Sequence, residues 1–194
     1  MFLENTINHA KQSGWMEVIC GSMFSGKTEE LIRRLRRAEM AGQRVEIFKP
    51  KIDTRYDDDN VVSHNQTKIR STPVESSGEI LLLGSTCDVV AIDEAQFLDM
   101  DIVKVANQLA NSGKRVIIAG LDMDYMGRPF GPMPNLMATA EYVTKVHAIC
   151  KKTGNLANYS MRISGSDELV QLGETDSYEA VSRRVFANEV LNND

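Results

Sequence analysis

A stretch near the start of the chain has the residue types and spacing that bind phosphate. It matches the pattern G-x-x-x-x-G-K-[ST] at every fixed position, and its residues are Gly21, Ser22, Met23, Phe24, Ser25, Gly26, Lys27 and Thr28. Glycines let such a loop turn tightly and direct backbone N–H groups at phosphate oxygens. Lys27 offers a positive charge to the outer phosphates, and the Thr28 hydroxyl offers a ligand to the Mg²⁺ of a nucleoside triphosphate. The loop therefore predicts binding of ATP or a similar nucleotide.

Two adjacent carboxylates form the second chemical feature. Asp93 and Glu94 follow an apolar run, residues 87–92, that is typical of a buried strand. An acid at the carboxyl end of a strand beside a phosphate loop is where such enzymes place the carboxylate that orients Mg²⁺. Asp93 suits that role, and Glu94 is then free to accept a proton from an attacking hydroxyl.

The segments around these residues predict a parallel α/β sheet of the P-loop NTPase type, with flanking helices. Apolar runs predict strands, and apolar stripes predict helices between them. In the first helix, Leu31, Leu35 and Ala38 form the apolar stripe, and the neighbouring arginines are expected on the solvated faces, with subunit contacts as the alternative. The predicted strands are 15–20, 44–48, 87–92, 116–120 and 144–150, and the predicted helices are 27–40, 78–83, 100–111 and 136–142.

The remaining segments are predicted to be loops or a small C-terminal module. Residues 49–71 are polar and predict a long loop or extended excursion, and residues 122–135 predict an ordered loop at the same edge as the acids. Residues 151–176 predict a hairpin or loop module, and residues 178–191 a helix. We therefore expect an N-terminal extension (1–14), a nucleotide-binding domain (15–149) and a small module (150–194).

Composition limits the class of protein. The chain has 194 residues, of which 42% are hydrophobic, and this is enough for one domain with a small appendage. The net charge of −5, without a basic tail, argues against a nucleic-acid partner. No signal peptide or long apolar run is visible, so we expect no membrane association and a cytoplasmic location. Cys20, Cys87 and Cys150 are too few and too scattered for a disulfide scaffold.

Several segments together resemble one family, the tetrameric, zinc-containing thymidine kinases of bacteria and animals. The resemblance covers nearly the whole chain in the family's order. Its segments are residues 21–28 (GSMFSGKT), 49–56 (KPKIDTRY), 93–97 (DEAQF), 120–122 (GLD), 128–132 (RPFGP) and 178–180 (YEA).

The resemblance implies ATP-dependent phosphorylation of the 5′-hydroxyl of thymidine or deoxyuridine. It implies that residues 21–28 bind ATP together with Asp93, Glu94, Ala95 and Gln96, that Thr28 and Asp93 hold Mg²⁺, and that Glu94 is the base. Lys27 and Arg55 are expected near the phosphates. The nucleoside would contact Met23, Asp53, Phe97, Leu121, Ser160 and Tyr178, under a C-terminal lasso at residues 163–178. A homotetramer or homodimer is expected from the resemblance alone.

The sequence departs from the family at the zinc site. The family's paired C-x-x-C motifs correspond here to Cys150 and Thr153, and to Ser182 and Val185, so one competent ligand survives. We therefore predict no structural zinc. The lasso is then either held by apolar packing of Val181, Val185 and Phe186, or is looser than in the family.

Two other functions fit the phosphate loop. The chain could be an ATPase or a kinase for another small molecule, with Asp93 and Glu94 positioning water or a different hydroxyl. It could also bind nucleotide without catalysis. The last alternative is disfavoured because the chain contains all the groups that the chemistry needs, namely Lys27, Thr28, Asp93 and Glu94.

Overall fold

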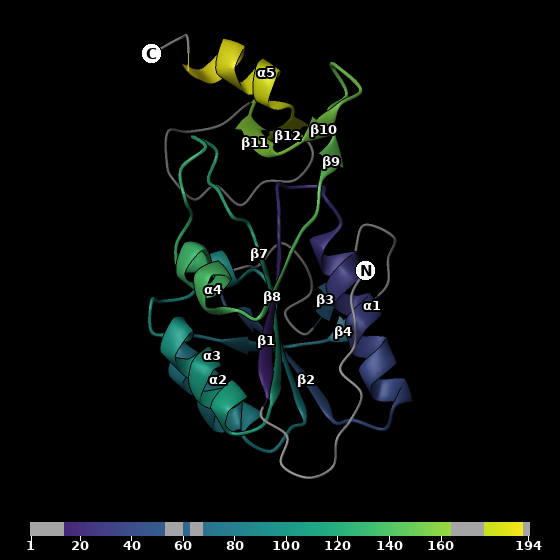
Figure 1. Cartoon of the computed structure of the whole chain (residues 1–194), viewed down its shortest axis with the longest axis vertical. Helices are drawn as coiled ribbons and strands as arrows, with labels where there is room; N and C mark the ends of the chain where they lie inside the picture. Colours follow the sequence, from purple (N-terminus) through teal and green to yellow (C-terminus); the bar gives the residue numbers. More distant parts are fainter. Residues whose placement is uncertain (1–13, 53–59, 63–67, 164–176, 192–194) are drawn as a thin grey trace.

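The centre of the protein is a parallel sheet built from the apolar runs of the sequence. The structure, a computed structural model, describes residues 14–52, 60–62, 68–163 and 177–191 (Figure 1). The sheet has six strands in the order β5-β2-β6-β7-β1-β8, and every neighbouring pair is parallel. Its strands are β1 (Trp15–Cys20), β2 (Val45–Pro50), β5 (Thr72–Val74), β6 (Val89–Ile92), β7 (Arg115–Gly120) and β8 (Tyr142–Lys145). The predicted α/β fold is confirmed.

Helices cover both faces of this sheet (Figure 1). One face carries α1 (Lys27–Met40), and the other carries α2 (Ser77–Gly84), α3 (Ile102–Asn111) and α4 (Met133–Thr139). Successive strand residues point to opposite faces of the sheet, so β1 contributes side chains to the apolar layers on both faces. Ile19 packs with Leu31 and Leu35 of α1, whereas Val18 belongs to the cluster under the other helices. These two apolar layers fix the positions of the strand ends.

A small module follows β8 and lies beyond the carboxyl ends of the strands, at the top of Figure 1. It contains the antiparallel pair β9 (Ala148–Ile149) and β10 (Leu156–Ala157), and a second pair, β11 (Tyr159–Arg162) and β12 (Tyr178–Val181). It ends in α5 (Arg183–Phe186) and a π-helical turn, η2 (Ala187–Leu191). The Tyr159 ring stacks on Phe186 with centroids 4.3 Å apart, so the module has an apolar core of its own.

The described residues contain three shorter elements and no membrane-spanning helix. A hairpin of β3 (Asn60–Val62) and β4 (Lys68–Arg70) lies within the predicted 49–71 excursion, and a 3-10 turn, η1 (Ala95–Phe97), follows β6. No helix among the described residues is long and apolar enough to cross a bilayer.

Several expectations from the sequence were wrong in detail. The helix predicted at 136–142 is α4, which spans Met133–Thr139, and Tyr142 already belongs to β8. The strand predicted at 144–150 is split: β8 ends at Lys145, Val146 makes one more bond to Cys20, and β9 then pairs elsewhere. The helix predicted over 178–191 begins as strand β12, because residues 178–181 pair with β11. The short edge strand β5 was not predicted, because it contains Pro73 and proline argues against a strand. At the edge of a sheet, however, proline is tolerated.

Arg34 also differs from expectation, because it is buried and not solvated. Its Nη1 donates to Glu17 Oε2 at 2.8 Å, and the Nε of Arg115 donates to Glu17 Oε1 at 2.7 Å. The indole of Trp15 also donates to Glu17, at 2.7 Å. The Glu17 side chain is fully buried, so this network joins β1, β7 and α1 inside the protein.

We predict that Glu17→Gln lowers the free energy of unfolding by about 3–5 kcal/mol, because it removes the carboxylate that pairs with buried Arg115 and one of the two that pair with buried Arg34. Urea denaturation measures this. The matched control is Asp88→Asn, which breaks the exposed Arg44–Asp88 pair and should cost less than about 1 kcal/mol. Equal effects of the two substitutions would contradict the structural role of the buried network.

Candidate functional site

The predicted phosphate loop connects β1 to α1, and its shape depends on two glycines. Gly21 has φ 149°, and a Cβ there would lie 2.2 Å from the Val146 carbonyl oxygen. Gly26 has φ 84° and immediately precedes α1. Inside the loop, the carbonyl of Ser22 accepts hydrogen bonds from Ser25 Oγ at 2.7 Å and from Lys27 Nζ at 2.8 Å. The ammonium group of Lys27 thus lies against the loop at the N-terminus of a helix, where anions bind.

Thr28 and Asp93 meet beside this loop. Asp93 follows β6, which is separated from β1 by β7, and the carboxyl ends of these parallel strands share one edge. The Thr28 hydroxyl donates to Asp93 Oδ2 at 3.2 Å, and Asp93 is buried. A hydroxyl and a carboxylate are hard oxygen ligands, and Mg²⁺ is usually held by such a pair together with phosphate oxygens and water. The two side chains therefore fit the ion of a Mg²⁺–nucleotide complex.

Glu94 has an unusual backbone conformation. Its φ is 52°, in the left-handed region that non-glycine residues seldom occupy outside functional sites. Its N–H donates to Asp93 Oδ1 at 3.0 Å, and Gln96 Nε2 donates to Glu94 Oε2. The Oε1 of Gln96 accepts the Leu121 N–H at 2.9 Å. Gln96 therefore fixes the Glu94 carboxylate relative to the end of β7.

Close packing surrounds the buried Gln96 amide. A Cβ at Gly131 would lie 2.4 Å from the Gln96 carbonyl oxygen, and a Cβ at Gly120 would lie 2.9 Å from Gln96 Oε1. The sequence assigned Gln96 to the nucleotide, and in the structure its side chain positions Glu94.

Residues predicted to contact the nucleoside come from several elements around the same edge. The Met23 N–H donates to Ser160 Oγ at 2.9 Å, which joins the phosphate loop to β11. Phe97 packs edge-on against Phe130, with ring centroids 5.8 Å apart. Leu121 follows β7, and Tyr178 begins β12. Asp53 and Arg55 lie outside the described residues.

Sequence reasoning missed Arg162 and Tyr125. The Arg162 guanidinium lies 3.8 Å from the Tyr125 ring centroid, and its Nη2 donates to the Tyr178 hydroxyl at 2.8 Å. This contact ties the loop after β7 to the β11–β12 pair. The aromatic residue within the glycine- and proline-rich 122–135 loop was the available signal.

An ion pair braces the start of the phosphate loop. Gly120, Cys20 and Lys145 are in register across β7, β1 and β8, and Lys145 Nζ pairs with Asp122 Oδ2 at 2.5 Å. Burial and the nearby Asp122 carboxylate raise the pKa of the Cys20 thiol to about 11, and Lys145 and Lys27 oppose this. Cys20 is therefore an uncharged packing residue at neutral pH.

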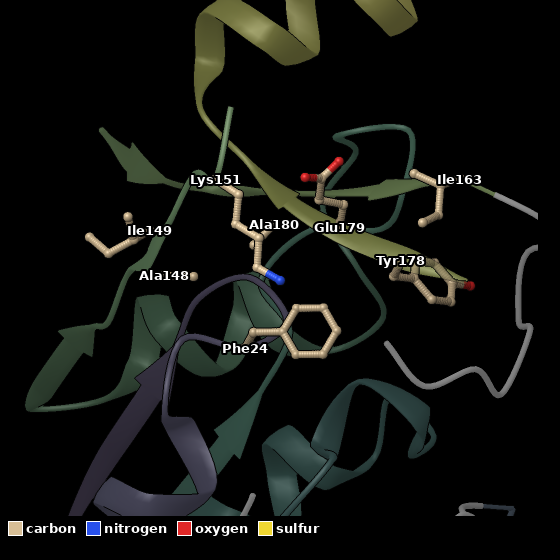
Figure 2. Close-up of a pocket in the computed structure, with 8 residues that line it drawn as sticks. All are labelled: Phe24, Ala148, Ile149, Lys151, Ile163, Tyr178, Glu179 and Ala180. Atoms are coloured by element: carbon tan, nitrogen blue, oxygen red, sulfur yellow. The ribbon is translucent and has the colours of Figure 1, made fainter. Parts of the chain in front are cut away.

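A pocket of about 540 Å³ lies between the phosphate loop and the small module (Figure 2). Phe24 forms its wall on the loop side. Residues of β9 and β12 form the remaining walls, together with Lys151, which follows β9, and Ile163, which follows β11. Phe24 is the second non-glycine residue of positive φ among those described, at 61°.

The four positions of the family's zinc motifs come together in the module. The Thr153 hydroxyl donates to Ser182 Oγ at 3.3 Å, and Cys150 and Val185 belong to the same apolar cluster. Burial alone raises the pKa of the Cys150 thiol. Hydrogen bonds with Thr153 and Ser182 together lower the pKa by more than burial raises it, so the resulting value is about 7. Within the described residues, no group of three or more His, Cys, Asp and Glu side chains could hold a metal.

The parallel sheet, the glycine-bounded loop between β1 and α1, and the Thr28–Asp93 pair define a P-loop nucleotide-binding protein. The family model for thymidine kinase matches residues 14–186. This chain therefore belongs to the thymidine kinase family, as the sequence predicted.

Close relatives cover nearly the whole chain. A thymidine kinase of Rhodothermus sp. is 61% identical over 93% of this chain and 84% of its own length. One from Bacteroides thetaiotaomicron is 59% identical over 96% of this chain and 94% of its own. Among solved structures, a DNA replication initiation factor is similar over 68% of this chain and 40% of its own, at 17% identity and a TM-score of 0.40, which is too remote to carry an inference.

We predict that the purified protein carries only trace zinc, because Thr153, Ser182 and Val185 stand at positions where the family has zinc ligands. Atomic absorption on dialysed protein measures this. The matched control combines Thr153→Cys, Ser182→Cys and Val185→His, which adds three ligands to Cys150, four in all, and should bind about one zinc per chain. Stoichiometric zinc in the unmodified protein would contradict the prediction.

Proposed function

We propose that this protein transfers the γ-phosphoryl group of ATP to the 5′-hydroxyl of thymidine, with deoxyuridine as a second acceptor. The observation that carries the proposal is the convergence of the phosphate loop, Asp93 and Glu94 at one edge of the sheet in a member of the thymidine kinase family. The relatives named above as thymidine kinases support the choice of acceptor.

Each residue has a distinct task in this proposal. The loop amides and Lys27 hold the phosphates and stabilise the charge that develops on them during transfer. Glu94 accepts the proton of the 5′-hydroxyl as its oxygen attacks in line. Gln96 donates to one carboxylate oxygen of Glu94 and so orients the base. Thr28 and Asp93 would hold Mg²⁺, which neutralises phosphate charge when it is bound.

Nucleoside contacts are proposed for Met23, Phe97, Leu121, Ser160 and Tyr178. The Met23–Ser160 hydrogen bond supports this, because it attaches the small module to the phosphate loop, and Arg162 holds the Tyr178 hydroxyl within the module. Asp53 is proposed as a further nucleoside contact and Arg55 as a residue near the phosphates, both on the resemblance to the family alone. Assembly into a homotetramer or homodimer, a cytoplasmic location and the three-part division of the chain stay predictions.

A transfer assay tests the function. Labelled ATP and Mg²⁺ are supplied with thymidine, deoxyuridine, deoxycytidine or no acceptor. We expect label on thymidine and deoxyuridine. Hydrolysis of ATP at the same rate without any nucleoside would instead support an ATPase, and ATP binding without turnover would support a non-catalytic protein.

We predict that Glu94→Gln lowers kcat by about 10²–10⁴-fold, because the amide cannot accept the proton of the attacking hydroxyl. Affinity for ATP should change little, since the loop and Lys27 are intact. Steady-state kinetics and equilibrium ATP binding provide the two readouts. Glu39→Gln, at the exposed far end of α1, is the control. An unchanged kcat in Glu94→Gln would remove Glu94 as the base.

A further inference from the structure

Lys49, a residue without a task in the proposed transfer, lies beside the carboxylates of the site. It is the last residue but one of β2, which is the neighbour of β6 in the sheet. The parallel register pairs Phe48 with Ile92, and the Asp93 N–H donates to the carbonyl of Phe48 at 2.9 Å. Continuing this register by one residue places Lys49 next to Asp93 at the carboxyl edge.

The side chains of Lys49 and Asp93 are on the same face of the sheet. Because side chains of a strand alternate between the two faces, Lys49 shares a face with Ile47. Asp93 shares a face with Ala91 for the same reason. Ile47 and Ala91 both belong to the apolar cluster under α1, and the contact of Asp93 with Thr28 agrees with this placement. Lys49 is therefore on the face where the phosphate loop continues into α1.

Lys49 is buried, which is unusual for a lysine. Its exposed fraction is 4%, whereas Lys51, two residues later, pairs with Glu75 and has a side chain that is 64% exposed. Burying an ammonium group costs free energy unless anionic or polar groups compensate its charge, so lysines are seldom buried without such a group. The terminal phosphate of a nucleotide bound at the loop would bring several anionic oxygens to this face.

We propose that Lys49 is a second phosphate-binding lysine, which contacts the terminal phosphoryl group of the donor and discriminates a nucleoside triphosphate from a diphosphate. This rests on the proposed function, in which the donor's phosphates occupy the loop. Lys27 approaches from the loop after β1 and Lys49 approaches from β2, and the acids follow β6, which lies between these strands. The two ammonium groups therefore reach the transferred group from different sides. Lys49 donates hydrogen bonds to it and stabilises its charge, without forming a covalent bond or transferring a proton.

Equilibrium binding of a non-hydrolysable ATP analogue and of ADP, both with Mg²⁺ and without acceptor, tests this role. We expect Lys49→Met and Lys49→Gln each to weaken binding of the triphosphate analogue by about 10- to 100-fold, because a charge-assisted hydrogen bond to the terminal phosphate is lost. ADP lacks that phosphate, so its affinity should change little, and retained ADP binding shows that a variant is folded. Lys49→Arg keeps the charge and should recover part of the loss. The matched control is Lys51→Met, which removes the neighbouring exposed lysine and should leave both affinities unchanged.

Three results would overturn this role. They are an unchanged preference for the triphosphate in a Lys49 variant that binds ADP normally, an equal loss for ADP and the analogue, and the same loss of preference in Lys51→Met. The second result would assign Lys49 to the fold or to the inner phosphates. The binding assay requires no phosphoryl transfer, so a failure to phosphorylate thymidine would refute the proposed function without deciding this test.

Discussion

The hydrogen bond between the Thr28 hydroxyl and the Asp93 carboxylate joins the two parts of the proposed transfer site. Thr28 belongs to the first turn of α1, and Asp93 follows β6, so no local sequence brings them together. Their contact depends on the strand order, which places β7 alone between β1 and β6 at a common carboxyl edge. The two apolar layers and the buried Glu17 network hold that order, and the chemistry of the site therefore rests on the packing of the sheet.

Backbone strain is concentrated at this edge. Phe24 and Glu94 are the two non-glycine residues with positive φ among those described, and both belong to the site. Such conformations cost of order 1–3 kcal/mol each and persist only where neighbours hold them. Gln96 does so for Glu94, and the Met23–Ser160 bond holds the loop next to Phe24. Contacts within the protein thus hold the phosphate loop and the proposed base in place.

The sequence predicted the elements that carry a strong local signal. The phosphate loop, the buried strands β1, β6 and β7, and the acids after β6 followed from motif and apolar periodicity, and the family followed from the order of the motifs. The burial of Arg34 could not be predicted, because its partner Glu17 lies on another element. The same holds for the positioning role of Gln96 and for the stacking of Arg162 on Tyr125, which arise from contacts between distant segments.

The small module shows where local patterns fail. Residues 144–150 have one continuous strand-like pattern, yet the chain leaves the central sheet after Val146 and begins a second sheet at Ala148. Residues 178–181 were predicted as helix, and their pairing with β11 makes them a strand. In both cases tertiary pairing outweighs local preference, as is common for short strands.

The most direct test of the account is the Mg²⁺ dependence of binding of a non-hydrolysable ATP analogue to Asp93→Asn, measured by calorimetry. If Thr28 and Asp93 hold the metal of the nucleotide complex, Mg²⁺ should strengthen binding to the unmodified protein. In the variant this gain should be lost, while metal-free binding and the free energy of unfolding change little. A variant that keeps the full effect of Mg²⁺ would contradict the assignment of this pair to the metal.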